Sequence, residues 1–220
     1  MQKLFSKLID LIYDNPCLIC KKYSKQSIVC KSCENSFTPR EQNYTKYFQE
    51  VTVFSWGLYE GNLREGIIRL KAGKKGLAAY FSKKLLVLWK KIPSNFKNEN
   101  CLVIPVPSHK KRIMVRGYCQ SSLMGKEFAK NLGFGFTNNF VIRKKETQYM
   151  NSLANINERI ENIKNAFEVA GILEEQKNTV IIDDILTSGS TICELARTIH
   201  QKYPNVTLTG LTIASGDTYN

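Results

Sequence analysis

One segment constrains this chain more than any other: Thr179-Val-Ile-Ile-Asp-Asp-Ile-Leu-Thr-Ser-Gly-Ser-Thr191. A hydrophobic strand runs into two adjacent acids, then into a loop of small hydroxylated residues, then into a helix that we expect to begin at about Thr191. The backbone N–H groups of residues 187–191, the hydroxyls and the positive end of the helix would together form a cradle for a phosphate. Gly189 permits the close backbone approach that such a cradle needs.

Asp183 and Asp184 stand where the strand ends, which is where open α/β sheets bind their ligands. Carboxylates there can accept hydrogen bonds from sugar hydroxyls. A phosphate cradle beside acceptors for two hydroxyls predicts a ribose 5-phosphate site. The structural alternative, a helix cap followed by a Ser/Thr-filled turn, is common for fragments of this motif. A P-loop and a dinucleotide fingerprint are excluded, because neither Gly-Lys-Ser/Thr nor the required glycine triplet is present.

The whole chain alternates strands with helices. Its 220 residues suit one domain, or one domain with a small appendage, and 43% hydrophobic with 23% charged residues excludes disordered, collagen-like and coiled-coil chains. Strand patterns cover 51–59, 101–106, 140–143, 180–182 and 207–213; helix patterns cover 63–71, 77–91, 121–132, a stretch near Asn155, and the interval between the last two strands. This order predicts an α/β fold with a mainly parallel sheet flanked by helices.

Four of the seven cysteines form the pattern Cys17-x2-Cys20-x9-Cys30-x2-Cys33. Two such turns supply the four thiolates of a tetrahedral zinc site, so we predict a zinc ribbon over 17–40. Its role would be structural, since four thiolates leave no open position for water. Disulfides are the alternative, and they do not suit a cytoplasmic chain. The remaining cysteines are expected to be small buried hydrophobes without chemistry: Cys101, Cys119 and Cys193.

The first sixteen residues resemble a signal peptide only superficially. Charges at positions 7, 10 and 14 interrupt the apolar residues, and no small-residue cleavage site follows, so an amphipathic helix over 1–16 is expected. No apolar run approaches the ~18 residues that a membrane span needs. A cytoplasmic location is therefore predicted.

The net charge of +13 is concentrated in one quarter of the chain. Residues 1–60 carry 8 basic and 6 acidic side chains, residues 61–116 carry 14 and 2, and residues 117–220 carry 10 and 11. Such a block is either a solvated face or a surface for a polyanion, such as nucleic acid or a multiply phosphorylated metabolite.

The segment 179–191 resembles the PRPP-binding motif of type I phosphoribosyltransferases. Together with further motifs in the same order, the resemblance narrows to the ComF (ComFC, GntX-like) competence protein family and covers nearly the whole chain from Cys17. These motifs are the cysteine pairs, Leu70-Lys71 with Gly73, Ile104-Pro-Val-Pro107, Arg116-Gly117-Tyr118 with Gln120, Thr147-Gln148, Arg159, Asn162 and Ala166-Phe167.

The resemblance implies a type I phosphoribosyltransferase fold over 41–220 behind the zinc ribbon. Asp183 and Asp184 would hold the ribose hydroxyls of PRPP, and Arg116 would lie near its pyrophosphate. The polar stretch 144–159 would be a mobile loop over the site. The other implied ligand residues are Ile185, Leu186, Thr187, Ser188, Gly189, Ser190 and Thr191 around the 5′-phosphate, and Ser108, Lys110, Lys111 and Arg112 in a loop near the pyrophosphate.

The implied chemistry is displacement of pyrophosphate from C1 of PRPP through a transition state with oxocarbenium character. Arg116, Lys111 and Mg²⁺ would stabilise the departing pyrophosphate, unless these side chains are solvated surface charges. Asp183, Asp184 and Arg116 are thus the predicted catalytic residues. The chain departs from the family pattern at Tyr118-Cys119 (more often Phe-Asn), at Ser188 (more often Thr) and at Ala72, which makes a ligand role for Lys71 weak.

The family resemblance also implies a part in DNA uptake and natural transformation, beside single-stranded DNA and a helicase-like partner. An enzyme that transfers phosphoribosyl to an unknown acceptor is one hypothesis. A non-catalytic module that senses PRPP, or binds single-stranded DNA or a partner protein, is the other. A purine-salvage enzyme with a zinc appendage is a third, and no purine pocket is recognisable in the sequence.

Overall fold

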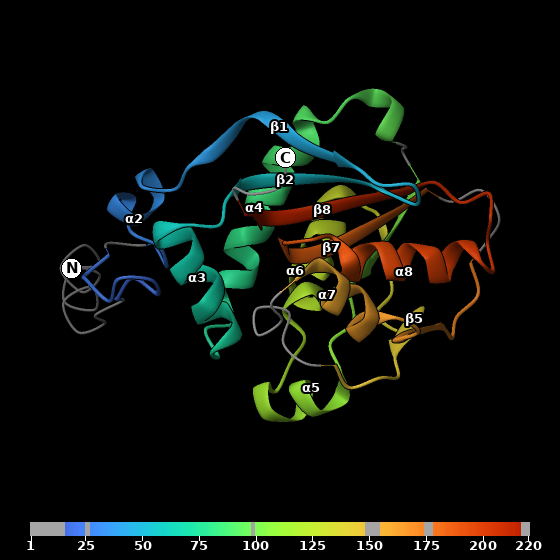
Figure 1. Ribbon diagram of the computed structural model, residues 1–220. Helices are drawn as coiled ribbons and strands as arrows, with labels where there is room; N and C mark the ends of the chain where they lie inside the picture. The colour runs from blue at the N-terminus through green and yellow to red at the C-terminus, as the bar shows by residue number, and fades with distance from the viewer. Residues whose placement is uncertain (1–15, 25–26, 98–99, 148–154, 174–177, 217–220) are drawn as a thin grey trace, which may run out of the picture.

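A computed structural model describes residues 16–24, 27–97, 100–147, 155–173 and 178–216. A six-stranded sheet in the order β1-β2-β8-β7-β3-β4 forms its centre (Figure 1). β1 is antiparallel to β2, and every other neighbouring pair is parallel. The strands are β1 (Pro39–Tyr47), β2 (Thr52–Leu58), β3 (Cys101–Pro105), β4 (Gly135–Phe136), β7 (Asn178–Leu186) and β8 (Leu208–Ser215).

Helices cover both faces of this sheet, which confirms the predicted α/β class (Figure 1). All eight residues of the central strand β8 are buried, as expected for a parallel strand covered on both sides. The helices are α2 (Lys31–Asn35), α3 (Gly61–Lys71), α4 (Gly76–Lys91), α5 (Lys110–Arg116), α6 (Gln120–Leu132), α7 (Ile156–Ile163) and α8 (Ser190–His200), with a 3-10 turn at Ser94–Phe96.

The two faces of the sheet form two separate hydrophobic clusters. The neighbours Ile181 and Ile182 on β7 belong to different clusters, because successive side chains of a strand point to opposite faces. The first cluster includes the buried faces of α3, α4 and α6, and the second includes that of α8. The helical spacing of Leu77, Phe81 and Leu85 therefore does mark core positions, as the sequence suggests.

The sequence patterns miss β1, α5 and β6 (Phe167–Val169), among other elements. Within the part of the chain that the structure describes, β1 pairs with β2 alone, and this polar edge strand lacks the apolar content of an inner strand. The predicted loop after Pro107 is wrong over residues 110–116, which form α5 between the proline and Gly117, a left-handed C-cap. The predicted strand near 140–143 is β5 (Val141–Arg143), which pairs with β6 (Phe167–Val169) in a separate two-stranded sheet.

Two predictions fall largely or partly outside the described residues. The amphipathic helix over 1–16 is one, since only its last residue is described. The loop over 144–159 is the other; its described ends are 144–147 and the start of α7. None of the helices in the described part of the chain has the length and hydrophobicity that crossing a bilayer requires.

Candidate functional site

Two adjacent acids lie at the carboxyl end of β7, in the middle of the sheet. Asp184 is buried, with 5% of its surface exposed. Its Oδ2 lies 2.7 Å from Nζ of Lys71, the last residue of α3, and 3.5 Å from Nε2 of Gln120, the first residue of α6. The backbone N–H of Asp184 donates to Oδ1 of Asp183 at 2.9 Å. Three elements thus converge on this acid pair.

The surroundings of the acid pair shift the pKa values of Lys71 and Asp183. Burial alone would lower the pKa of Lys71, but the facing carboxylate of Asp184 raises it above its ordinary value, so Lys71 is an ammonium here. Burial, followed by repulsion from Asp184, raises the pKa of Asp183 well above that of an ordinary aspartate. The ion pair therefore belongs to Asp184, and Asp183 keeps its proton to a higher pH than an ordinary aspartate does.

The loop 187–189 connects β7 to α8 and is called the phosphate loop below. Gly189 is the N-cap residue of α8 and adopts a φ of 82°, a left-handed conformation that favours glycine. The hydroxyls of Ser188 and Ser190 lie 2.6 Å apart and hydrogen-bond to each other. The helix begins at Ser190, one residue before the predicted start, so residues 187–191 do occupy a helix N-terminus.

A cavity of about 950 Å³ opens beside the acid pair. It brings together Lys111, Arg112 and Arg116, which the sequence predicted near a pyrophosphate. Ser108 and Lys110, from the same prediction, lie outside its lining. Four cations and one acid face it, so the cavity favours an anion. Its lining residues are Lys71, Ala72, Gly73, Lys111, Arg112, Val115, Arg116, Glu146 and Thr147.

Hydrogen bonds connect these cations to their surroundings. Nη2 of Arg112 donates to the backbone oxygen of Thr147 at 2.7 Å. Nζ of Lys111 lies 2.5 Å from a carboxylate oxygen of Glu146, and its hydrogen bond lowers the pKa of that exposed carboxyl. Nη1 of Arg116 donates to Oε1 of Gln120.

A chain of polar contacts therefore runs from the cavity to the acid pair. Arg116 contacts Gln120, Gln120 contacts Asp184, and Asp184 contacts Lys71. Sequence reasoning gave Lys71 a weak role and Gln120 none. Both residues belong to the motifs that carry the family resemblance, and this was the sequence signal that could have identified them as site residues. These four residues, with Asp183, Lys111 and the phosphate loop, are called the carboxyl-edge site below.

Tyr118 connects two backbone segments of this site. Its hydroxyl donates to the backbone oxygen of Leu70 and accepts from the N–H of Gly73 at 3.1 Å. The ring therefore fixes the segment that carries Lys71 against the turn between α5 and α6. A phenylalanine, the commoner residue of the family pattern here, could not make these bonds. Cys119, half-buried, lies 3.2 Å from the hydroxyl of Ser121.

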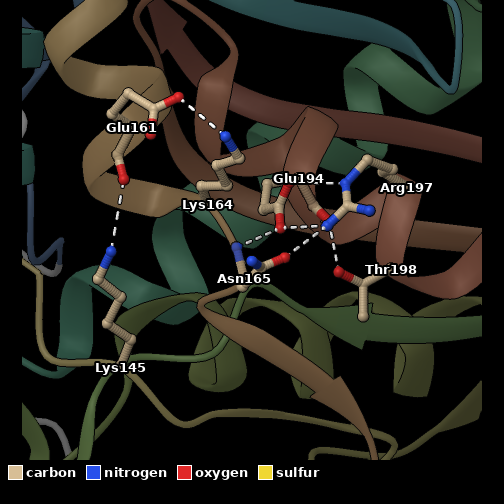
Figure 2. A network of polar contacts seen from close by, with 7 residues as sticks. All are labelled: Lys145, Glu161, Lys164, Asn165, Glu194, Arg197 and Thr198. Carbon is tan, nitrogen blue, oxygen red and sulfur yellow. Dashed lines mark hydrogen bonds and ion pairs between the residues drawn. The ribbon is translucent and has the colours of Figure 1, made fainter.

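A second cavity, of about 630 Å³, borders the phosphate loop. Ser188 and Ser190 line it together with Phe48 and residues of α7 and α8. Its charges are mostly paired, as Figure 2 shows: Arg197 donates to both carboxylate oxygens of the buried Glu194, at 2.9 and 2.7 Å.

The same network holds α7 against α8 (Figure 2). Glu194 also accepts from the backbone N–H of Asn165 at 2.7 Å, and Lys164 pairs with Glu161 at 3.1 Å. Burial works to raise the pKa of Glu194, yet hydrogen bonds from Arg197 and Asn165 hold it below its usual value. The network therefore holds the end of α7 against α8, beside the cavity that Ser188 and Ser190 line.

The four cysteines of the paired motif form a cluster. Their Sγ atoms all lie within 4.8 Å of one another. Sγ of Cys17 is 3.9 Å from that of Cys33, and Sγ of Cys20 is 3.7 Å from that of Cys30. These separations exclude disulfides, in which the sulfurs are about 2.05 Å apart.

The cluster fits a structural metal such as zinc. Tetrahedral coordination with Zn–S bonds of about 2.3 Å separates the sulfurs by about 3.8 Å, close to the two distances above. Burial opposes ionisation of Cys17, but N–H groups of Cys30 and Ile19 that point at its sulfur bring the pKa of the thiol down to about 6. Thiolate is the form that ligates a metal.

The cysteine cluster packs directly on the helices that lead to the carboxyl-edge site. Cys17, Ile19 and Cys33 share the first hydrophobic cluster with the buried face of α3. A Cβ at Gly66 of α3 would lie 3.1 Å from Cδ1 of Ile19, so glycine allows this close approach. Glu34 of α2 forms an ion pair with Lys84 of α4 at 2.5 Å.

No protein-family model matches the chain. Over 96 residues it is 32% identical to the DNA utilization protein YhgH of Salmonella typhi and 31% identical to that of Escherichia coli K12. Each match covers 43% of this chain and 41% of the relative, so the chain spans about two fifths of the length of these curated relatives.

Among solved structures, the adenine phosphoribosyltransferase of Leishmania tarentolae aligns with a TM-score of 0.36 at 14% identity, over 79% of this chain and 95% of that one. The enzyme of Leishmania donovani aligns with a TM-score of 0.30 at 12% identity, over 86% and 84%. The similarity to YhgH and the four-cysteine cluster agree with the resemblance that the motifs predict, and the chain is thus similar to the ComF-like (GntX-like) DNA utilization proteins.

Proposed function

We propose that this chain binds PRPP and transfers its phosphoribosyl group, with release of pyrophosphate, in the service of DNA utilization. One observation carries the proposal: a cavity faced by four cations and one acid adjoins, through the Lys71–Asp184 ion pair, a strand end with two carboxylates and a glycine-capped helix N-terminus. PRPP carries a pyrophosphate, a ribose and a 5′-phosphate in that order, and these three environments match its three parts.

The acid pair and the phosphate loop would hold the sugar phosphate. Asp183 and Asp184 accept hydrogen bonds from the 2′- and 3′-hydroxyls, and the N–H groups of 187–191 bind the 5′-phosphate. Ile185 and Leu186 contribute backbone only, since the side chain of Leu186 is buried in the second hydrophobic cluster and that of Ile185 packs against the first. C1 then faces the cationic cavity.

The reaction breaks the bond between C1 and the pyrophosphate oxygen and forms a bond from C1 to the acceptor's nucleophilic atom. The electron pair of the broken bond leaves with pyrophosphate, so negative charge grows where Lys71, Lys111 and Arg116 face the cavity. Mg²⁺, whose preferred ligands are carboxylate and phosphate oxygens, would neutralise part of that charge when it enters with PRPP.

Lys71 gains a role that the sequence left weak. In the absence of ligand it neutralises the buried Asp184, and its Nζ already lies at the boundary between the acid pair and the cavity. A ribose whose hydroxyls occupy the carboxylate would leave this ammonium to the pyrophosphate. Lys71 is therefore proposed as a ligand of the leaving group, alongside Arg116.

The cellular role is proposed from similarity. The relatives are named DNA utilization proteins, and the ComF resemblance implies natural transformation with a helicase-like partner.

A non-catalytic module that binds single-stranded DNA is the second candidate, and one observation favours it. Lys83, Lys90 and Lys91 are exposed on α4, which lies on the sheet away from the phosphate loop. A row of cations on one helix suits the backbone of a nucleic acid. Lys84 does not belong to this row, because it is committed to Glu34.

Calorimetric titration with PRPP and Mg²⁺ tests the first candidate, with Asp183→Asn/Asp184→Asn as the binding-deficient variant. We expect binding by the wild type and at least tenfold weaker binding by the double variant. Equal binding by both, or by neither, would refute a PRPP site at these acids. Anisotropy with a fluorescent oligodeoxythymidylate then compares Lys83→Gln/Lys90→Gln/Lys91→Gln with the wild type. Loss of DNA binding with PRPP binding intact would support the second candidate.

A further inference from the structure

The turn between β1 and β2 lies against the phosphate loop, although the two are far apart in sequence. A Cβ at Gly189 would lie 2.3 Å from Cζ of Phe48 and 2.7 Å from its Cε1. The ring therefore rests on the Cα of the residue that caps α8. Ser188 and Ser190, on either side of that glycine, line a cavity together with the same ring.

The turn is itself anchored. The N–H of Phe48 donates to the backbone oxygen of Val51 at 3.1 Å. The carboxylate of Glu50 lies 2.8 Å from Nδ1 of His200, the last residue of α8, whose Nε2 lies 2.9 Å from the backbone oxygen of Val206. The turn thus contacts α8 at both of its ends, and Phe48 is held in place independently of the phosphate loop.

A phosphate site at a helix N-terminus depends on backbone N–H groups that are already in position. Glycine is the residue with the most conformational freedom to lose, so a left-handed Gly189 relaxes easily unless its neighbours hold it. Within the loop, the hydroxyls of Ser188 and Ser190 contact each other, and the N–H of Ser190 donates to Oγ of Ser188 at 3.4 Å. A rigid ring against Cα adds the restraint that these bonds lack.

We propose that Phe48 is a positioning residue of the phosphate loop. Its ring holds Gly189 in the left-handed conformation that starts α8, so that the 5′-phosphate of the ligand meets a preformed set of N–H donors. This inference rests on the proposed function. Phe48 carries no polar side-chain group and is absent from the lining of the cationic cavity, so it acts on the phosphate end of the ligand and not on the pyrophosphate end.

The experiment separates the two ends of the ligand. Calorimetry measures the affinity of the wild type, Phe48→Ala and Phe48→Leu for ribose 5-phosphate and, separately, for pyrophosphate with Mg²⁺. Tyr47→Ala is the matched control, because it removes the neighbouring aromatic ring at a position that is 71% exposed. We expect Phe48→Ala to weaken the binding of ribose 5-phosphate by about tenfold and to leave the affinity for pyrophosphate unchanged. Phe48→Leu, which keeps an apolar side chain against the glycine, should recover most of the loss.

Each outcome decides the matter. Unchanged ribose 5-phosphate affinity in Phe48→Ala, or an equal loss for both ligands, overturns the positioning role and leaves the proposed function standing. Loss in Tyr47→Ala as large as in Phe48→Ala overturns it too, because the effect would then belong to the turn in general. A wild type that binds neither ligand refutes the proposed function and this inference together. If Phe48→Ala does not fold, Phe48→Val takes its place, because it also withdraws most of the side chain from Gly189. A selective loss of ribose 5-phosphate affinity in Phe48→Val then supports the role, and wild-type affinity in that variant overturns it.

Discussion

The four-cysteine cluster draws its thiols from one short segment, 17–33, whereas the carboxyl-edge site draws its residues from α3, α5, α6, β7 and the phosphate loop. In the first, spacing along the chain already places the sulfurs together. In the second, neighbours such as Lys71 and Asp184 meet only because the sheet and its helices are assembled. Local sites are therefore readable from spacing, and assembled sites depend on packing.

The two regions are nevertheless not independent. Ile19, between two of the cysteines, packs on Gly66 of α3, and Lys71 stands at the end of that helix. A structural metal would therefore stabilise the helix that positions Lys71.

The largest effect is expected from breaking the metal cluster. Cys20→Ser removes one of four thiolates, so zinc content should fall and the free energy of unfolding should drop by about 4 kcal/mol. Affinity for PRPP should fall with it, because α3 loses its support. Metal analysis and thermal denaturation measure both, with Cys119→Ser as the control cysteine outside the cluster. A metal-free variant with wild-type stability and PRPP affinity would separate the two regions.

A smaller effect is expected at the junction of the acid pair and the cavity. Lys71→Gln leaves Asp184 buried without its cation, at a cost of about 2 kcal/mol, and should weaken PRPP and pyrophosphate binding. Urea denaturation and calorimetry measure the two effects. Lys74→Gln removes the same charge at an exposed position nearby and should change stability little. If both variants behave alike, the Lys71–Asp184 ion pair contributes nothing specific.

What could be predicted from the sequence follows the same division between local and assembled sites. The cysteine cluster, the acid pair and the helix N-terminus at 187–191 were all predictable, because each is encoded within one strand, turn or helix. The basic segment correctly indicated a cationic surface, and Lys111, Arg112 and Arg116 do line one cavity.

What the sequence missed depends on contacts between distant segments. The role of Lys71 appears only when the end of α3 is seen beside β7, and that of Phe48 only when the edge hairpin is seen against α8. β1 was missed because a polar edge strand lacks alternation. α5 was missed because its apolar residues, Ile113, Met114 and Val115, are all exposed, the last two by 83% and 91%, and give no core pattern.

The raised pKa of Asp183 gives the acid pair a pH-dependent cost to stability. The folded protein keeps this proton to a higher pH than the unfolded chain, which releases it as the pH rises above about 3.9. Stability is then lost with increasing pH, and Asp183→Asn should be more stable than the wild type by about 1 kcal/mol at pH 7. The difference should vanish near pH 4, while the variant binds PRPP poorly. Urea denaturation at both pH values checks the sign, and a variant less stable at pH 7 would contradict it.

The smallest effect should come from the rim of the cavity. Lys111 is 69% exposed and pairs with Glu146, which is 52% exposed, so Lys111→Gln should leave the melting temperature unchanged. Its charge nevertheless faces the cavity, so affinity for pyrophosphate should fall by about threefold at low salt. Raising the ionic strength should remove the difference, because water and salt screen exposed charges. Glu146→Gln, which removes the competing carboxylate, should instead increase the affinity for pyrophosphate. If neither substitution changes pyrophosphate affinity at low salt, Lys111 is an ordinary surface lysine, and the anion site is confined to the more buried group around Lys71 and Arg116.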